Sequence, residues 1–157
     1  MLAWHACSNP SRRPDFLDVV NIGCTRGDRP LFKGLSFALK RGELLHITGR
    51  NGSGKTTLFH IIMGLIKPLS GTVEAFGELR EAEVDFIEVR RRIGLLFQDA
   101  DDQLFSPTVL EDVAFGPLND GATPDAAMAQ ARTILEELGL HGVEHRAAHH
   151  LSGGERR

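Results

Sequence analysis

Tyrosine is absent from this sequence of 157 residues, tryptophan occurs once and cysteine twice. Long apolar runs are absent too: the longest covers residues 61–66, whereas a helix that crosses a bilayer needs about 20 apolar residues. Cys7 and Cys24 have neither a paired nor a metal-type spacing, which indicates the reduced thiols of a cytosolic protein. These absences argue against a membrane span, a disulfide scaffold and a cysteine-based metal site.

An excess of positive charge is also lacking. The net charge is −3, and no cluster of lysine and arginine suggests a groove for nucleic acid. The 41% of hydrophobic and 25% of charged residues match a soluble globular protein, and the length suits one domain with a buried core. Residues 1–14 show neither periodicity nor a signal-peptide pattern, so we expect a disordered tail there.

Strand-like and helical patterns alternate over the first part of the chain. The strand-like stretches are residues 17–22, 31–39, 44–48, 72–76 and 93–97. The stretch at 44–48 is an apolar run with the length of a buried strand. Apolar residues at helical spacing predict a helix over 55–64. A second helix is expected over 84–92, where three arginines near its end suit the helix dipole.

Beyond Gln98 the pattern becomes mainly helical. A short helix is expected over 108–115, ended by Gly116 and Pro117. A second helix is expected from an N-cap at Thr123 to Gly139. The sequence therefore predicts an α/β protein in which a helical segment follows the alternating part.

A glycine-rich stretch matches the phosphate-binding pattern G-x-x-x-x-G-K-[ST] in full. The match consists of Gly49, Arg50, Asn51, Gly52, Ser53, Gly54, Lys55 and Thr56, and Thr57 follows it. Glycines let the backbone N–H groups point at phosphate oxygens, and the next helix presents its unpaired N–H groups to the same anion. We expect Lys55 to reach the β- and γ-phosphates of ATP and the Thr56 hydroxyl to bind Mg²⁺. This pattern alone does not distinguish kinases, GTPases, helicases and transport ATPases.

A second motif narrows the choice. Residues 151–155 read Leu-Ser-Gly-Gly-Glu and resemble the signature of ATP-binding-cassette (ABC) ATPases, which is most often Leu-Ser-Gly-Gly-Gln. In that family the signature lies at a helix N-terminus. The resemblance implies that Ser152, Gly153 and Gly154 donate to the γ-phosphate of ATP held by a second cassette. It therefore implies a head-to-tail pair of identical or different cassettes.

The resemblance also covers Gln98, which follows the stretch at 93–97 where the family places its Q-loop glutamine. There Gln98 would contact Mg²⁺ or the attacking water; otherwise it is a solvated polar residue. The implied fold is a P-loop NTPase cassette with a RecA-like core, an N-terminal β subdomain and a helical subdomain. On this basis residues 15–98 form the nucleotide-binding core and residues 99–157 form the Q-loop and helical subdomain.

The adenine-binding residue departs from the family pattern. The family stacks the base on an aromatic residue some 23 positions before the first loop glycine, and here that position is Arg26. A guanidinium group can stack on a base. Arg26 is thus either a base-stacking residue or an exposed turn residue, and both interpretations stay open.

Residues 93–117 indicate which cassette ATPases are most similar. They resemble the ATPases of energy-coupling-factor importers, notably of cobalt and nickel, with Asp-Asp-Gln-Leu-Phe, Pro-Thr-Val and Glu-Asp-Val-Ala-Phe-Gly-Pro in order. In those proteins the segment docks a transmembrane coupling protein, which implies contacts from Leu104, Phe105 and Pro107. Alternatively, these three belong to the core of the helical subdomain. Residues 24–26 and 31–37 also resemble the ATPase of haem exporters.

Elements that the resemblance implies after the signature do not occur in these 157 residues. They are an aspartate strand, a catalytic glutamate and a switch histidine, which position Mg²⁺ and water. We therefore expect a truncated cassette that binds nucleotide weakly, hydrolyses almost none and has an unpaired strand at 44–48. The alternatives to a transport motor on the cytoplasmic side of the membrane are a non-functional remnant and a soluble ABC ATPase of DNA repair or translation.

Histidines recur at a spacing of four at His141, His145 and His149. On a helix they would share one face and could bind a transition metal. The favoured interpretation is a solvated surface, because Glu144 is the only carboxylate in this stretch.

Overall fold

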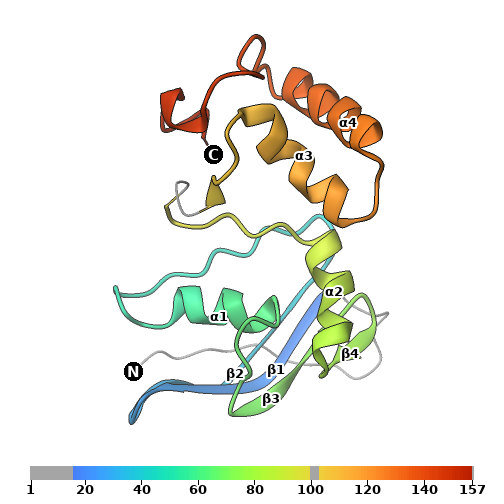
Figure 1. Cartoon of the computed structure of the whole chain (residues 1–157). Coiled ribbons are helices and arrows are strands. Elements are labelled where there is room, and N and C mark those ends of the chain that lie inside the picture. The colour runs from blue at the N-terminus through green and yellow to red at the C-terminus, as the bar shows by residue number, and fades with distance from the viewer. Residues whose placement is uncertain (1–15, 100–102, 157) are drawn as a thin grey trace. The chain divides into compact units, whose positions relative to one another are not determined.

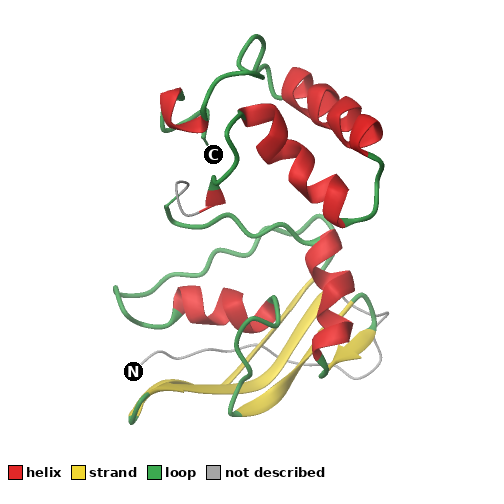
Figure 2. Cartoon of the chain, in the orientation of Figure 1, coloured by secondary structure: helices red, strands yellow, loops and turns green. Residues whose placement is uncertain are grey.

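The computed structural model describes residues 16–99 and 103–156. The chain divides into two compact units, Met1–Leu95 and Leu96–Arg157, each with its own hydrophobic core. Figures 1 and 2 show the helices and strands of both units. The tail expected at residues 1–14 and the two aspartates at 101 and 102 lie outside the described residues. The boundary proposed between residues 98 and 99 stays a prediction.

The first unit is built on a four-stranded antiparallel sheet with the order β2-β1-β3-β4. Its strands are β1 (Leu17–Arg26), β2 (Arg29–Leu39), β3 (Ser70–Ala75) and β4 (Glu78–Arg80). A two-residue turn joins β1 to β2, and Gly27 takes a positive φ of 58° there, which glycine adopts without a steric cost. The expected strands at 17–22, 31–39 and 72–76 are confirmed, the first of them four residues longer.

Two helices pack on this sheet: α1 (Lys55–Ile62) and α2 (Glu83–Arg92). Both helices were expected, and their apolar faces are buried: Ile61 of α1 and Val89 of α2 are fully enclosed with Val19 and Ile22 of β1. α1 ends two residues earlier than expected, since Gly64 adopts a left-handed φ of 71° that closes a helix. This core fixes the start of α1 relative to the sheet.

A buried arginine stabilises the edge of the first unit. Arg80 is 6% exposed, and it donates to the carbonyl oxygens of Ala75 and Asp85 at 2.9–3.3 Å. It also forms ion pairs with Glu78 and Glu88 at 3.3 and 2.8 Å. A guanidinium group can be buried because these acceptors replace its water.

Two predicted strands do not form. Residues 44–48 and 93–97 have no strand pairing within the described part of the chain, and the side chain of Leu44 is 97% exposed. An apolar run shows that a segment can become a strand, but the ladder exists only where a neighbouring strand supplies the hydrogen bonds. A strand at 44–48 does not form in this structure, and the absence of pairing there agrees with the expectation that this segment lacks a neighbour. Ile47, Ile93 and Leu95 pack partly against the first core.

The second unit contains α3 (Val109–Asn119), α4 (Pro124–Glu137) and a short 3₁₀ helix, η2 (Ala148–His150). α3 and α4 pack against each other (Figure 1). The Thr123 hydroxyl accepts from the N–H of Ala126 at 3.4 Å and Pro124 takes the first helical position, which confirms the predicted cap. Gly139 follows α4 with a positive φ of 73°, also as expected.

The end of α3 differs from its prediction. The helix continues through Gly116 and Pro117 to Asn119 instead of ending at residue 115. Proline removes one i→i−4 hydrogen bond, but the last turn is closed by the N–H of Asp120, which donates to the carbonyl of Gly116 at 3.1 Å. No helix within residues 16–99 and 103–156 is long and apolar enough to cross a membrane.

Candidate functional site

The glycine-rich loop at residues 49–54 leads directly into α1 (Figure 1). Ser53 N donates to the carbonyl of Arg50 at 3.1 Å, and Leu58 N donates to the carbonyl of Gly54 at 2.9 Å. Gly52 and Gly54 have φ angles of 77° and 97°, a region that residues with a Cβ rarely adopt. The glycines therefore stand where the backbone must turn before the helix begins.

Strand β2 supports the loop from the side. A Cβ atom on Gly54 would lie 2.9 Å from Cε1 of Phe32 and 3.2 Å from Cβ of Leu31. A Cβ contact of 2.9 Å is shorter than side chains allow, so glycine lets the loop come this close to β2. The phenyl ring of Phe32 is thus part of the support of the loop.

Lys55 is folded back over the loop. Its Nζ atom donates to the carbonyl oxygens of Gly49 and Arg50, at 2.7 and 3.1 Å. Thr56 and Thr57 follow in the first turn of α1, where the backbone N–H groups have no partner within the helix. An ammonium group and unpaired N–H groups beside one loop form a site for an anion.

A cavity of about 610 Å³ adjoins the loop. It is lined by Arg29, Pro30 and Leu31 of β2 and by the loop residues Gly49, Arg50, Asn51, Gly52 and Ser53. Arg26 is exposed at the end of β1, opposite Arg29, and does not line this cavity. Arg29 is not among the site residues predicted from the sequence, although the turn at 27–28 places residues 26 and 29 opposite each other.

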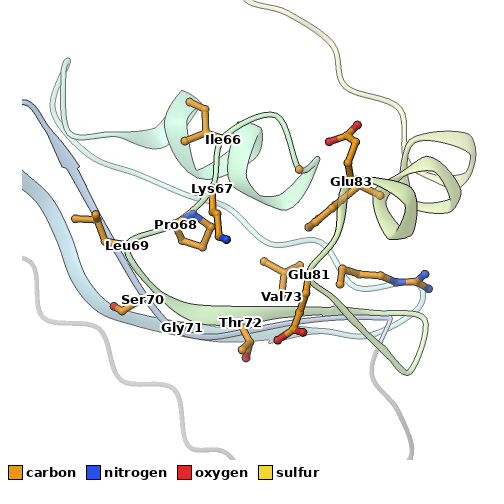
Figure 3. Close-up of a pocket in the computed structure, with 13 residues that line it drawn as sticks. Ile66, Lys67, Pro68, Leu69, Ser70, Gly71, Thr72, Val73, Glu81 and Glu83 are labelled. Atoms are coloured by element: carbon orange, nitrogen blue, oxygen red, sulfur yellow. The ribbon is translucent and has the colours of Figure 1, made fainter.

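A second cavity of about 540 Å³ lies between the end of α1, β3 and the start of α2 (Figure 3). Lys67, Arg80, Glu81 and Glu83 contribute charges of both signs to its lining. The carboxylates of Glu81 and Glu83 point away from each other (Figure 3), and Arg80 already has its own acceptors. This cavity therefore lacks the concentrated positive charge that the phosphate loop offers to an anion.

The signature residues form a capped turn in the second unit. Ser152 N donates to Oε2 of Glu155 at 2.7 Å, and Glu155 N donates to Oγ of Ser152 at 3.3 Å. Arg156 N donates to the carbonyl of Ser152 at 3.1 Å. This reciprocal pair is a capping box, and Gly153 and Gly154 are exposed next to it.

Glu155 is charged in this turn. The Ser152 hydroxyl and then the Ser152 N–H donate to its carboxylate, and these bonds, with the nearby charge of Arg146, lower the pKa of Glu155 from its ordinary value. A glutamate at this position can therefore form the same cap as the more frequent glutamine, but with a negative charge.

The remaining predicted contacts also lie in the second unit. Gln98 is exposed. Phe105 is 66% exposed and its ring packs edge to face on Phe115 at a centroid distance of 4.6 Å. The Asp112 carboxylate accepts from Phe105 N and Ser106 N at 3.2 and 2.9 Å, which fixes this segment at the start of α3. Phe105 and Pro107 are exposed, Leu104 is half-buried, and none of the three belongs to the described core of this unit.

The histidines do not share a helical face. Residues 141–147 form turns rather than a helix, and the rings of His149 and His150 contact each other at a centroid distance of 4.2 Å. Within the described ranges no group of three or more histidine, cysteine, aspartate or glutamate side chains could hold a metal ion.

Known proteins resemble this chain over most of its length. A protein of Nitratidesulfovibrio vulgaris that carries the name ABC transporter ATP-binding protein is 52% identical over 141 residues, which are 90% of this chain and 52% of that protein. The energy-coupling factor transporter ATP-binding protein EcfA of Methanothermobacter thermautotrophicus is 46% identical over 129 residues, which are 82% of this chain and 42% of EcfA. The chain thus spans about half the length of these curated relatives.

Two solved structures share the fold. The structure of cbiO1 from Clostridium perfringens, described as part of the ABC transporter complex cbiONQ, aligns with a TM-score of 0.78 and 32% identity over 92% of this chain and 58% of cbiO1. A dimeric structure of the ATP-binding cassette MJ0796 with bound ADP and Pi aligns with a TM-score of 0.73 and 25% identity over 89% of this chain and 65% of that chain. Both confirm the predicted cassette fold. Since the family described as ABC transporter also matches residues 32–157, the chain belongs to the ABC transporter family.

Proposed function

We propose that this chain is the ATP-binding part of a transport motor. The observation that carries the proposal is the phosphate loop, over whose carbonyl groups Lys55, the first residue of α1, is folded back. ATP would replace the contacts of Lys55 with Gly49 and Arg50 by contacts with its own phosphates. The backbone N–H groups of the loop and of α1 would orient the same phosphates.

Magnesium fits this site as an ion carried by the nucleotide. Thr56 is exposed in the first turn of α1 and offers a hydroxyl oxygen, a donor that Mg²⁺ accepts. No described cluster of acidic side chains forms a complete cage, and Mg²⁺ commonly takes most ligands from phosphates and water. We propose that the Thr56 hydroxyl is a protein ligand of this ion. When bound, the ion would neutralise charge on the phosphates.

The signature turn supports a pair of cassettes. Gly153 and Gly154 are exposed, and a Cβ on either would meet no atom within 4 Å. A phosphate of ATP bound to a second chain can therefore approach their backbone N–H groups. In the proposed dimer the Ser152 hydroxyl would exchange its bond with Glu155 for one with the γ-phosphate.

The proposed partner is a transmembrane coupling protein of an energy-coupling-factor importer. EcfA is named as the ATP-binding protein of an energy-coupling factor transporter, and cbiO1 is described as part of the ABC transporter complex cbiONQ. Phe105 and Pro107 offer exposed apolar surface at the start of α3. The chain would then lie on the cytoplasmic side of the membrane through this partner. Cobalt and nickel are the cargo that the resemblance favours.

Hydrolysis is a separate part of the proposal. The carboxylates and histidine that the resemblance assigns to water and Mg²⁺ do not occur in residues 1–157. We propose that these 157 residues alone bind ATP without appreciable turnover. Release of phosphate from ATP by the purified chain at the rate of a complete cassette would contradict this.

Nucleotide binding is tested with the 157-residue chain and a fluorescent ATP analogue. Lys55→Ala removes a cation from the phosphate site, and charge-assisted bonds of this kind correspond to roughly 10- to 100-fold in affinity. Lys67→Ala is the matched control, because Lys67 lines the second cavity. Equal affinities for the wild type and Lys55→Ala would refute the proposed site. Circular dichroism of each variant checks that the fold is kept.

A further inference from the structure

The cavity of about 540 Å³ at the end of α1 is separate from the phosphate loop. Its lining residues come from three segments of the first unit: the turn after α1, the start of β3, and the segment from the end of β4 into α2. None of them belongs to residues 49–57, which form the phosphate loop and the first turn of α1. A ligand in this cavity would therefore not compete with a nucleotide for the same groups.

The walls of this cavity are tied to one another. Arg90 of α2 donates to the carbonyl of Met63 at 3.2 Å and forms an ion pair with Glu83, so the start of α2 is held at the end of α1. The Asp85 carboxylate accepts from Glu81 N at 3.0 Å, which fixes the turn before α2. The cavity is thus formed before a ligand arrives, and its volume lies in the range of roughly 300–1,000 Å³ that is typical of small-molecule pockets.

The floor of the cavity is apolar. Val73 of β3 and Phe86 of α2 are 2% and 8% exposed, and both belong to the core of the first unit. The Phe86 ring packs directly on Gly64, where an added Cβ would overlap with it. A ligand with an apolar body would remove these side chains from water. The other apolar residues of the lining are Ile66, Pro68 and Leu69.

Two charged side chains of the lining are available to a ligand. Arg80 and Glu83 already have the partners described above. The side chains of Lys67 and Glu81 form neither a hydrogen bond nor an ion pair within residues 16–99 and 103–156. In Figure 3, Val73 lies between the ammonium group of Lys67 and the carboxylate of Glu81. One positive and one negative charge therefore flank the apolar floor.

We propose that this cavity binds a small zwitterion with an apolar body, of the size of a dipeptide. The carboxylate of the ligand contacts the ammonium group of Lys67, and its amino group contacts the carboxylate of Glu81. Its apolar side chains cover Val73 and Phe86. A dipeptide matches the cavity because its two charges stand at opposite ends of an apolar body. This proposal is independent of the proposed function, since the two sites share no lining residue.

The test is an NMR titration of the isotope-labelled 157-residue chain with the dipeptide Leu-Leu. The amide signals of Gly64, Gly71 and Thr72 are expected to shift until the site is saturated, while that of Gly142 in the second unit stays in place. Acetyl-Leu-Leu lacks the amino charge and Leu-Leu-amide lacks the carboxylate. Each is expected to bind roughly 2- to 5-fold more weakly than Leu-Leu, as the loss of one exposed ion pair predicts.

Variants assign each end of the ligand. Lys67→Gln is expected to weaken Leu-Leu by roughly 2- to 5-fold and to leave Leu-Leu-amide unchanged. Glu81→Gln is expected to weaken Leu-Leu equally and to leave acetyl-Leu-Leu unchanged. Lys33→Gln is the matched control, because Lys33 is exposed on β2 and does not line the cavity. Free leucine, whose two charges share one carbon atom, is expected to bind more weakly than Leu-Leu.

Several results would overturn this proposal. They are the absence of saturable shifts with Leu-Leu, equal affinities for Leu-Leu and both capped forms, and a loss in Lys67→Gln that Lys33→Gln reproduces. Leucine that binds as tightly as Leu-Leu would refute the dipeptide size. A saturating ATP analogue is expected to leave the affinity for Leu-Leu unchanged, and displacement of Leu-Leu would place it in the phosphate site instead. A chain that binds Leu-Leu but no ATP would contradict the proposed function alone.

Discussion

Lys55 Nζ lies 2.7 Å from the carbonyl oxygen of Gly49, so the first residue of α1 is tied to the first residue of the phosphate loop. The same ammonium group donates to Arg50. The loop therefore has a cationic group bound in place before a nucleotide arrives. In the proposed complex, phosphate oxygens would replace these two carbonyl acceptors.

Lys55→Arg tests whether shape as well as charge matters at this position. A guanidinium group is planar and larger than an ammonium group, so it cannot occupy the point between the carbonyls of Gly49 and Arg50 in the same way. We expect ATP affinity to fall by roughly 10-fold or more, close to the effect of Lys55→Ala. Titration with the fluorescent analogue measures it. Wild-type affinity in Lys55→Arg would mean that charge alone suffices.

Gly54→Ala tests the close approach between the loop and β2. Alanine at a φ of 97° is strained, and its Cβ would meet Phe32 and Leu31. Strain of this kind corresponds to about 1–3 kcal/mol, and we expect the free energy of unfolding to fall by that amount and ATP binding to weaken. Chemical denaturation measures the first effect. Gly94→Ala is the control, since Gly94 has no positive φ and a Cβ there meets no atom within 4 Å.

Arg80→Met tests the buried arginine. Methionine fills much of the space but leaves the carbonyls of Ala75 and Asp85 without their donor. An unsatisfied buried carbonyl costs about 1–3 kcal/mol, so we expect a clear loss of stability of the first unit in thermal denaturation. Lys67→Ala should stay near the wild type. A stability unchanged by Arg80→Met would show that packing alone holds this edge.

The capping box at the signature predicts a dependence on pH. The pKa of Glu155 is lowered in the folded state by the Ser152 hydroxyl and N–H. Its contribution to stability is therefore fully present above the pKa of the unfolded state and is lost as the pH falls through the folded pKa. We expect an acid transition of the Glu155 side chain, followed by NMR, below the ordinary range of a glutamate.

Glu155→Gln is the control for this transition. The amide keeps an acceptor for Ser152 N but does not titrate. The turn should then keep the same backbone amide shifts across the acid range. A titration of the Ser152 amide that persists unchanged in Glu155→Gln would assign the transition to another group.

Local patterns explain what the sequence could predict. The phosphate loop with α1, the hairpin at β1 and β2 and the cap of α4 at Thr123 each depend on neighbouring residues, and all form as expected. The strands predicted at 44–48 and 93–97 do not form, because pairing depends on a partner segment that an apolar run does not specify. α3 passes Pro117 because the following N–H groups close its last turn.

The candidate site divides in the same way. The order of residues in the loop predicts which backbone and side-chain groups would meet a phosphate, and the capping pattern of Ser152 and Glu155 is also a local one. The positions of Arg29 and Arg80 could not be predicted, because each depends on which distant segment packs beside it. Arg80, for example, is buried only because the carbonyls of Ala75 and Asp85 lie within its reach.

The unpaired segment at residues 44–48 has a consequence for the behaviour of the protein in solution. The side chain of Leu44 is almost completely exposed, and the backbone that follows belongs to no ladder in the described part of the chain. A segment with an exposed apolar side chain and a backbone outside any ladder can pair with an edge of another molecule, so aggregation should increase with concentration. The same segment leads directly into Gly49, the first residue of the phosphate loop. Molecules that aggregate through it would therefore lose nucleotide binding at the same time. Precipitation and inactivation of a stored sample would then follow one shared time course.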